Sequence, residues 1–372
     1  MAKAFHRLSI DLAKPLAEQP GVGHNRWHPA IEPRLHVNPG DRVTIECFDA
    51  VDGQITKPDP AANGPLELGR VHPLSGPVYI RDAEPGDLLE VQIIEIEPAT
   101  SAFTAITPTM GFLREDFPTS FTAIWRLAGG FAESAQVPGV RVPAACFPGV
   151  IGVAPSYELL KRANDREQKL RQSGGAAPPP DRSGAVPATD AIAAEGLRTI
   201  PPRENAGNVD IKQLTAGARV FIPVWEKGAL FSIGDGHFAQ GDSECCGTAI
   251  EMAAAFHLEF YLRKGEAARR RLRDIAFAHD RYFTAPEMAA PRRFYATTGM
   301  PITAAGENRA DDLALAARNA VRHMIDYLHE ERGYSREQAY VICSVAVDLR
   351  ISQVVDVPNF TVSALLPLEI FV

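Results

Sequence analysis

The sequence predicts a β-rich α+β fold, with mostly antiparallel strands and a helical hairpin near the C-terminus. Thirty prolines and 29 glycines are spread along the 372 residues, which indicates many turns and short strands rather than a helical bundle. Segments that alternate apolar and polar side chains recur along the chain, as half-buried strands do. Residues 309–335 instead place apolar side chains near helical spacing.

The first 160 residues are expected to form a β-rich region. Residues 42–49 (RVTIECFD) alternate apolar and polar side chains directly after an Asn-Pro-Gly-Asp turn. Residues 84–98 repeat this arrangement, because a Pro-Gly-Asp turn again precedes an alternating strand pattern. Residues 145–156 (ACFPGVIGVAPS) have the pattern of a buried strand flanked by prolines.

Residues 161–198 differ in composition from what precedes them. The stretch KRANDREQKLRQ could extend a short helix, and the Gly, Pro and Ser residues after it are typical of a flexible or polyproline-like segment. We expect either a linker or a mobile lid here. Residues 199–372 then form a C-terminal α+β region, unless both regions build one intertwined domain.

The C-terminal region begins with strand patterns at residues 218–225, 229–235 and 255–263. The predicted helical hairpin follows. Acidic residues precede its first helix, Gly333 follows it, and Ser335 with Gln338 fits a capping box that opens the second helix.

Bulk properties exclude several classes of function. The net charge of −8 offers no electrostatic footprint for nucleic acid or an anionic membrane. The N-terminal stretch lacks the apolar core of a secretory signal, and no run approaches the roughly 18 apolar residues of a membrane helix. Five cysteines without a framework of spacings indicate reduced thiols and a cytoplasmic protein.

Residues 234–251 (GDGHFAQGDSECCGTAIE) form the densest group of chemically active side chains. Asp235 and His237 are two residues apart after a predicted strand, so in extended backbone they point to the same side. A carboxylate and an imidazole together suit Zn²⁺ or a similar ion, and a hydrogen-bonded loop is the alternative. The further acids of the stretch are Asp242, Glu244 and Glu251.

Three other polar clusters lie between apolar segments. Residues 201–210 (PPRENAGNVD) contain possible ligands and hydrogen-bonding groups, and residues 48–55 (FDAVDGQI) follow a predicted strand directly. Residues 71–80 (VHPLSGPVYI) are the third cluster. Each of these clusters taken singly is also compatible with a solvated turn.

Cys246 is a candidate nucleophile because Gly247 and Thr248 follow it, and their amides could donate to an oxyanion. An ordinary buried cysteine is the alternative. The sequence contains neither a Gly-x-Ser-x-Gly elbow nor a phosphate-binding Gly-rich loop of standard spacing.

Several long motifs, in order, resemble the acetamidase/formamidase family of amidohydrolases. They are GDRVTIECFDAVDGQI, HPLSGPVYIRDAEPGDLLEVQI, FPGVIGVAPS, IPPRENAGNVDIKQLTAGARVFIPV, GDGHFAQGDSECCGTAIE and AYVICSVAVDLRISQVVD. The resemblance implies hydrolysis of a short carboxamide to a carboxylate and ammonia, a β-rich fold and a homo-oligomer. The family usually has glycine where this chain has Ser243, and an apolar residue where it has Cys245.

Amide hydrolysis needs an activated water, polarisation of the carbonyl group and a proton for the departing ammonia. We therefore expect a divalent metal, zinc with calcium as the alternative, bound by His237, Asp235 and Asp52. The expected catalytic acids and bases are Glu244 and Asp242, and the expected substrate-binding residues are Asn208, Arg203 and Glu204. The open alternatives are a thioester route through Cys246 and a protein that binds an amide or ion without turnover.

Overall fold

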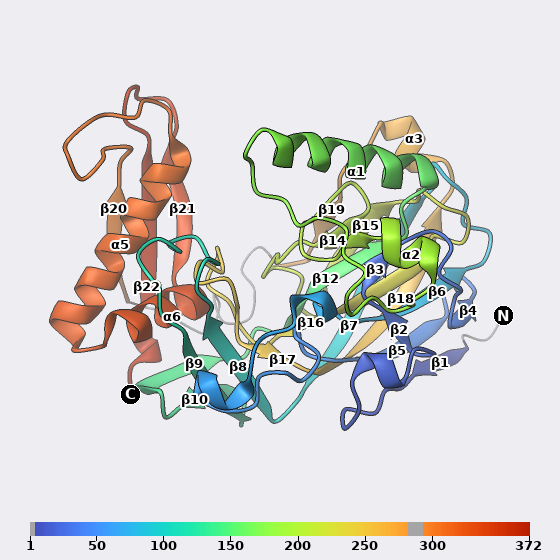
Figure 1. Cartoon of the computed structure of the whole chain (residues 1–372), viewed down its shortest axis with the longest axis horizontal. Coiled ribbons are helices and arrows are strands. Elements are labelled where there is room, and N and C mark those ends of the chain that lie inside the picture. Colours follow the sequence, from blue (N-terminus) through green and yellow to red (C-terminus); the bar gives the residue numbers. More distant parts are fainter. Residues whose placement is uncertain (1–3, 282–292) are drawn as a thin grey trace.

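The computed structural model describes residues 4–281 and 293–372, and two β-sheets form the body of the protein (Figure 1). The smaller sheet has six strands in the order β1 (Phe5–Leu8), β5 (Arg42–Cys47), β18 (Ala254–Arg263), β7 (Leu88–Pro98), β15 (Arg219–Pro223) and β19 (Ala276–Ala278). Strand β7 comes from the first 160 residues and lies between β18 and β15, which come from the C-terminal region. The division of the chain at residues 161–198 stays a prediction.

The larger sheet has eleven strands and carries the functional residues described below. Its main path is β11 (Val137–Pro143), β10 (Phe131–Ser134), β9 (Phe121–Ala128), β8 (Ser101–Ile106), β17 (Glu251–Met252), β16 (Phe231–His237), β12 (Phe147–Val153) and β14 (Ala206–Asn208). Beside this path, β6 (Leu74–Ile80) pairs with β16, β2 (Gly23–His24) and β4 (Leu35–Val37). Within the described ranges, only the pairs β1–β5 and β4–β6 are parallel, which confirms the mostly antiparallel fold.

Apolar side chains between the two sheets form the main core. Phe231 on β16 packs edge-on against Phe260 on β18, with 5.0 Å between ring centroids. The Cys47 thiol on β5 donates to the carbonyl oxygen of Ile233 at 3.3 Å. All four side chains are almost fully buried, as the alternating sequence patterns require of residues on the inner face of a strand.

The two Pro-Gly-Asp turns have the same local structure. Gly40 and Gly86 both have φ of +93°, a conformation that is strained for any residue with a side chain. The Asp41 and Asp87 carboxylates accept backbone N–H groups of residues 38 and 84 at 2.9 and 2.8 Å. Each turn therefore reverses the chain and delivers it to a buried strand, β5 or β7.

The C-terminal unit forms a projecting arm at the left of Figure 1. Its three-stranded sheet has the order β20 (Phe294–Gly299), β22 (Thr361–Pro367) and β21 (Asp348–Gln353), and it packs against α5 (Leu313–Arg332), which α6 (Arg336–Ala346) follows. Gly333 ends α5 with φ of +75°, and Ser335 with Gln338 forms the capping box at the start of α6. The predicted hairpin is confirmed.

The segment between the two regions contains short elements that cover the larger sheet. Helix α1 (Tyr157–Gln172) packs Leu160 and Ala163 against Trp27 and Val150. The same segment also contains α2 (Asp190–Glu195) and β13 (Leu197–Arg198), which pairs with β3 (Arg26–Trp27). Short elements elsewhere in the chain are α3 (Glu266–Arg270) and 3₁₀ turns at Leu16–Glu18, Pro60–Asn63, Leu68–Arg70 and Leu368–Ile370.

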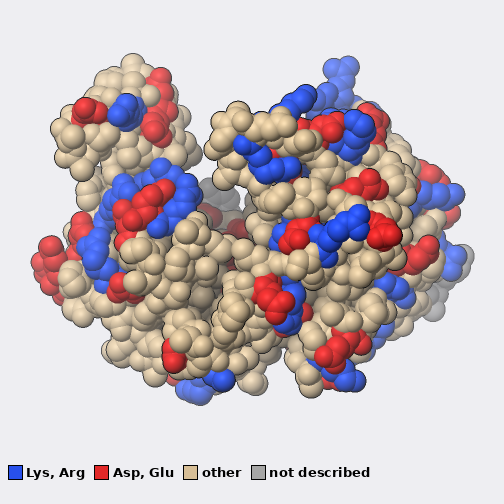
Figure 2. Space-filling view, viewed as in Figure 1, with Lys and Arg blue, Asp and Glu red and all other residues tan. Residues whose placement is uncertain are grey.

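Surface charges of both signs are interspersed on the face drawn in Figure 2. Many of them pair across elements, as Arg322 on α5 does with Asp116 at 2.6 Å. In the described part of the chain, no helix combines the length and the apolar character that crossing a membrane requires.

Candidate active site

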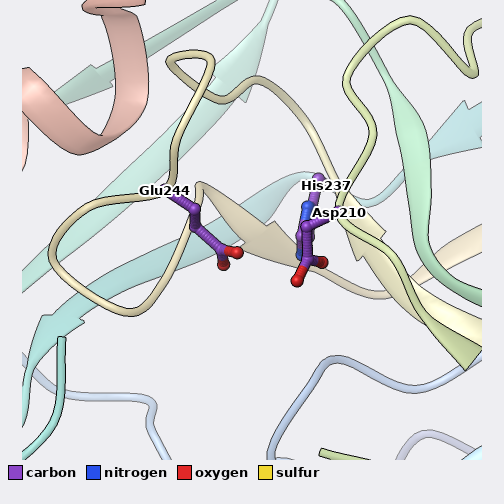
Figure 3. A group of neighbouring side chains, drawn as sticks. All are labelled: Asp210, His237 and Glu244. Carbon is purple, nitrogen blue, oxygen red and sulfur yellow. The ribbon is translucent and has the colours of Figure 1, made fainter. Parts of the chain in front are cut away.

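Four carboxyl groups surround the imidazole of His237 at the end of strand β16. The Nε2 atom of His237 lies 3.0 Å from Glu251 Oε2, 3.4 Å from Asp235 Oδ1 and 4.0 Å from Asp210 Oδ1. The fourth, Glu244, belongs with Asp210 and His237 to a group whose possible ligand atoms all lie within 4.8 Å of one another. Asp235, His237 and Glu251 form a second such group. Figure 3 shows Asp210 beside His237, with Glu244 reaching toward both from a loop.

Strand pairing brings these residues together from distant parts of the sequence. Strand β16 supplies Asp235 and His237, and Glu251 on β17 is the direct cross-strand partner of His237. The loop between β16 and β17 supplies Glu244. Asp210 follows the end of β14, on the other side of β12.

Gly149 on β12 provides the space in which these side chains meet. A Cβ atom at this position would lie 2.4 Å from Asp235 Oδ2, 2.7 Å from Asp210 Oδ1 and 2.7 Å from His237 Cε1. Its carbonyl oxygen accepts the backbone N–H groups of Val209 and Asp210 at 3.0 and 3.2 Å. Any larger residue at position 149 would therefore displace the cluster.

The backbone of three acidic residues is also unusual. Asp210, Asp235 and Glu244 have φ values of +46°, +57° and +51°. Non-glycine residues adopt positive φ at a cost, and such residues concentrate at functional sites, where surrounding structure holds them in place.

Several buried polar atoms of the cluster have no hydrogen-bond partner among the described residues. They are Asp210 Oδ1, Asp235 Oδ1, Glu251 Oε2 and both ring nitrogens of His237. An unpartnered buried polar atom is unfavourable, and most such atoms in native proteins are satisfied by protein or water. One imidazole nitrogen and several carboxylate oxygens, all without partners and converging on one point, are a donor set that fits a divalent cation.

Burial and mutual charge shift the acidities of the cluster in different directions. Burial, reinforced by the Glu251 and Asp235 charges, raises the pKa of Glu244 to about 8, although Glu244 keeps some exposed surface. Burial raises the pKa of Glu251 to about 7. Burial and the Glu244 charge raise the pKa of Asp210 well above its ordinary value.

His237 and Asp235 behave as an ion pair within the cluster. Burial alone would lower the pKa of His237, but the Glu251 and Asp235 charges raise it well above its ordinary value. Burial alone would raise the pKa of Asp235, but the charges of His237 and His72 lower it. In the metal-free protein, then, Asp235 stays ionised, and Glu244 and Glu251, whose pKa values are raised to about 8 and 7, titrate near neutral pH.

A cavity of about 110 Å³ opens onto the cluster. Its polar end includes Asn208, Asp235, Glu244, Glu251 and His72. Its apolar wall includes Val51, Ile55, Leu66, Val71, Phe103 and Met110. An apolar pocket that ends in a few polar groups is the usual form of a site for a small organic molecule.

Larger hollows elsewhere lack this combination. One of about 460 Å³ adjoins the cavity and shares Ile55, Phe103 and Glu251 with it. Two others, of about 620 and 730 Å³, are lined by none of Asp235, Glu244 and Glu251. The small cavity is therefore the candidate active site, because chemistry and not volume distinguishes it.

The structure does not bring Asp52, Arg203 or Glu204 to the cluster. Asp52 accepts the Leu16 backbone N–H at 2.9 Å and forms an ion pair with Arg70 at 2.8 Å. Arg203 is bound by Glu167 of α1 at 2.6 Å. Glu204 accepts two hydrogen bonds from Arg166 of α1, at 2.6 and 2.7 Å. These pairs join α1 and the loops to the body of the protein.

Other residues selected from the sequence lie in or near the cavity. Asn208 and Cys246 line it. Asp242 does not, and its backbone N–H donates to Asp348 of the C-terminal unit at 3.1 Å. The Cys246 N–H donates to Ser344 Oγ at 3.0 Å, and burial raises the pKa of the thiol.

The sequence-based selection passed over three residues of the site. Asp210 and Glu251 belong to the polar clusters already noted, but nothing local distinguishes them from their neighbours. His72 belongs to the third cluster, residues 71–80, whose composition favours a turn over a site. Knowledge of which distant strands pair could have distinguished these three residues from their polar neighbours, but a single sequence does not provide it.

Comparison with known proteins agrees with this site. Residues 9–372 match the model of the Acetamidase/Formamidase family. The chain belongs to this family. It is 37% identical over 385 residues to a formamidase from Methylophilus methylotrophus, covering 98% of this chain and 93% of the relative. It is 38% identical over 364 residues to an acetamidase from Mycolicibacterium smegmatis, covering 90% of this chain and 88% of the relative.

Solved structures of similar proteins share the fold of this acetamidase/formamidase family member. A gamma lactamase from Delftia acidovorans superposes with a TM-score of 0.92 at 37% identity, covering 98% of this chain and 93% of that one. An acetamidase from Bacillus halodurans gives a TM-score of 0.56 at 25% identity, covering 94% and 96%. The family resemblance inferred from the sequence and the assignment to amide-hydrolysing enzymes are confirmed.

Proposed function

We propose that the protein hydrolyses a small aliphatic carboxamide to a carboxylate and ammonia, with the help of a bound divalent cation. The observation that carries this proposal is the convergence of unpartnered carboxylate and imidazole atoms at the end of an apolar cavity. Membership of a family whose relatives are named formamidase and acetamidase supports the choice of reaction.

Asp235, His237 and Glu251 would hold the cation, and Asp210 lies next to them. Glu251 Oε2 and Asp235 Oδ1 lie nearer to His237 Nε2 than Asp210 Oδ1 does, and all three side chains are almost fully buried. We favour zinc, because calcium sites use oxygen ligands and this set includes an imidazole nitrogen. Such an ion supplies Lewis acidity, which polarises a carbonyl oxygen and makes water more acidic.

Glu244 is the residue best suited to move the proton. Its pKa of about 8 lies near neutral pH, so both its protonated and ionised forms are available. As the water oxygen forms its bond to the carbonyl carbon, the Glu244 carboxylate takes a proton from that water. Glu244 then gives the proton to the nitrogen as the C–N bond breaks, and ammonia leaves.

The cavity wall sets the size of the acyl group. Aliphatic and aromatic side chains surround the space next to the cluster, and the cavity holds only a few non-hydrogen atoms beyond the reacting group. Enclosure also limits solvent around Glu244, which strengthens its electrostatic interactions. These features support a short-chain substrate.

A covalent route through Cys246 is the alternative mechanism, because this residue lines the cavity. The raised pKa of the buried thiol speaks against it, since a thiolate is the nucleophile in such reactions. A binding protein without turnover is the alternative from another class. It would keep the cavity but release no ammonia.

Ammonia release by purified protein tests the proposal. The substrates are formamide, acetamide, propionamide and a γ-lactam, each with added zinc and with chelator, beside elemental analysis of the protein. We expect ammonia or ring opening with at least one amide, and its loss on chelation. No turnover of any amide by metal-loaded protein would refute the function, and full activity without metal would refute the role of the cation.

The cytoplasmic location and the homo-oligomeric state stay predictions from the sequence.

A further inference from the structure

His72 and Asn208 are polar residues of the cavity that belong to neither group of possible metal ligands. His72 and Asn208 line the polar end beside Asp235, Glu244 and Glu251. His72 is 8% exposed, and its Nδ1 atom is buried with no hydrogen-bond partner among the described residues. Asn208 Oδ1 is also buried, with no hydrogen-bond partner among the described residues.

Two consecutive residues, Thr199 and Ile200, hold His72 and Asn208 by hydrogen bonds. The backbone N–H of His72 donates to Thr199 Oγ1 at 2.6 Å. The side-chain Nδ2 of Asn208 donates to the carbonyl oxygen of the next residue, Ile200, at 3.0 Å. Thr199 is fully buried, so this anchor is rigid. The hydrogen bond to Ile200 also determines which end of the Asn208 amide remains available, namely the acceptor oxygen.

The available groups complement a primary carboxamide. That group presents one carbonyl acceptor and two N–H donors. An imidazole ring carries at least one N–H donor in either protonation state, and Asn208 Oδ1 is an acceptor. A site built to hydrogen-bond a polar group discriminates strongly against analogues that lack this group, because its own buried atoms are then left unpaired.

We infer that His72 and Asn208 form a recognition pair for the amide group of the substrate. The His72 ring donates a hydrogen bond to the carbonyl oxygen, and Asn208 Oδ1 accepts one from the amide nitrogen. The pair orients the carbonyl carbon toward Glu244 while the apolar wall holds the acyl chain. This inference rests on the proposed function, but it concerns how the amide is bound and not whether it is cleaved.

The chain offers a matched control for each member of the pair. His24 is 1% exposed and also has an unpartnered Nδ1, but it hydrogen-bonds Ser232 Oγ at 2.7 Å and does not line the cavity. Asn205 is 1% exposed, donates Nδ2 to Val153 O at 2.8 Å and has an unpartnered Oδ1, again outside the cavity. Substitution of these residues removes the same chemistry without touching the proposed pair.

The test measures binding of acetamide and of methyl acetate, an ester with the same acyl group and no N–H. Dissociation constants are obtained by saturation-transfer NMR on zinc-loaded protein carrying Glu244→Gln, so that the ligand is not consumed. His72→Ala should weaken both ligands about tenfold, because both have a carbonyl oxygen. Asn208→Ala should weaken acetamide about tenfold and leave methyl acetate unchanged. His24→Ala and Asn205→Ala should change neither.

The outcomes separate this inference from the proposed function. The recognition pair would be overturned if His72→Ala left the acetamide affinity unchanged, or if Asn208→Ala lowered the affinities for acetamide and methyl acetate equally. It would also be overturned if the control variants lost as much affinity as the test variants, or if acetamide did not bind at all. Absence of turnover in the wild type with the expected binding pattern would overturn only the proposed function. Metal content and circular dichroism are recorded for every variant. If His72→Ala does not fold, His72→Gln, which keeps an N–H donor, should restore folding and most of the affinity.

Discussion

Buried arginines and buried carboxylates occupy two neighbouring regions of the protein, and they differ in how fully their polar atoms are paired. Arg26 is fully buried, yet its guanidinium donates to the carbonyl oxygens of Asn25, Gly69, Asp181 and Ser183 at 2.7 to 3.1 Å. Arg198, also buried, donates to the carbonyl oxygen of Leu68 and lies 3.7 Å from the Asp181 carboxylate. Burial lowers the pKa of Arg26 to about 10, so it remains charged at neutral pH.

Of the two arginines only the Nε atoms lack a hydrogen-bond partner among the described residues, whereas in the cavity the facing carboxylate and imidazole atoms lack one. The arginines hold the backbone next to Leu68, which lines the cavity wall, against the segment that carries Asp181. The arginines, which donate to backbone carbonyl oxygens, therefore support the wall, and the polar atoms that lack hydrogen-bond partners face the cavity. If the proposed cation and substrate bind here, they would relieve the unfavourable interactions of these unpartnered atoms.

Replacement of a cavity carboxylate should produce the largest effect on activity. We expect Glu244→Gln to keep its metal and to lose about 10²–10⁴-fold in kcat, because a general acid/base group typically contributes that much. Steady-state kinetics of ammonia release and elemental analysis measure the two quantities.

Glu259→Gln provides the control for this substitution. Glu259 is even more buried than Glu244, at 2% exposure, but it forms an ion pair with Arg42 at 3.4 Å, on the other sheet. Its replacement should leave kcat near the wild-type value. Equal losses in the two variants would mean that buried glutamates act on activity only through the fold.

Replacement of a buried arginine should instead affect stability. Arg26→Met keeps the aliphatic stem but leaves several buried carbonyl oxygens without a donor, and we expect the free energy of unfolding to fall by about 3 kcal/mol. Arg126→Met, at a solvent-exposed ion pair with Glu133, should change it by less than about 1 kcal/mol. Urea unfolding of both variants measures the difference, and similar values for both would show that the Arg26 hydrogen bonds add no stability.

Metal affinity should depend on pH if the unpartnered atoms are ligands or neighbours of ligands. Glu251 and Glu244 hold protons below pH values of about 7 and 8 in the metal-free protein, and cation binding must displace them. We expect the zinc affinity to fall about tenfold per pH unit for each displaced proton as the pH drops from 8 to 6. Competition with a chelating dye measures this slope, and an affinity independent of pH would place the cation elsewhere.

Local patterns predicted the local parts of the structure. The capping box at Ser335 and Gln338 needs only neighbouring residues, and the sequence identified it correctly. Asp235 and His237 converge as their spacing of two predicts, with 3.4 Å between Oδ1 and Nε2. The assignments of fold class and of the C-terminal hairpin rest on the same kind of short-range periodicity.

Residues whose partners are distant in sequence were not predictable in this way. Glu251 meets His237 only because β17 pairs with β16, and Asp210 arrives across β12. Asp52 follows a strand as a site residue would, but Arg70 occupies its carboxylate. Arg203 and Glu204 have the composition of a binding site, yet α1 supplies their partners. The sequence shows which polar residues lie between apolar segments. The fold determines which of these residues form pairs with other side chains.

Replacement of Asp210 by a neutral residue should stabilise the metal-free protein. The pKa of Asp210 is raised well above its ordinary value near 4, so at intermediate pH the folded state binds a proton that the unfolded state does not. Stability of the metal-free protein therefore decreases as the pH rises through this window. Asp210→Asn should raise the free energy of unfolding at pH 7 by about 1 kcal/mol while lowering activity. A loss of stability at pH 7 in the metal-free variant would mean that the cavity carboxylates support the fold.

Cys246 should be the least sensitive residue of the cavity, although it lines the same space as Glu244. Burial keeps its thiol protonated, and its Sγ lies 3.6 Å from the carbonyl oxygen of Thr248, to which a serine hydroxyl could donate. Cys246→Ser should therefore keep its metal and most of its turnover, with a loss of about 1 kcal/mol in stability for the smaller, more polar side chain. A thioester mechanism predicts the reverse: the serine variant loses turnover, alkylating reagents inactivate the wild type, and chelators have little effect. Metal content, alkylation and turnover are measured on one preparation. An inactive serine variant with full metal content would show that the thiol, and not water, is the nucleophile.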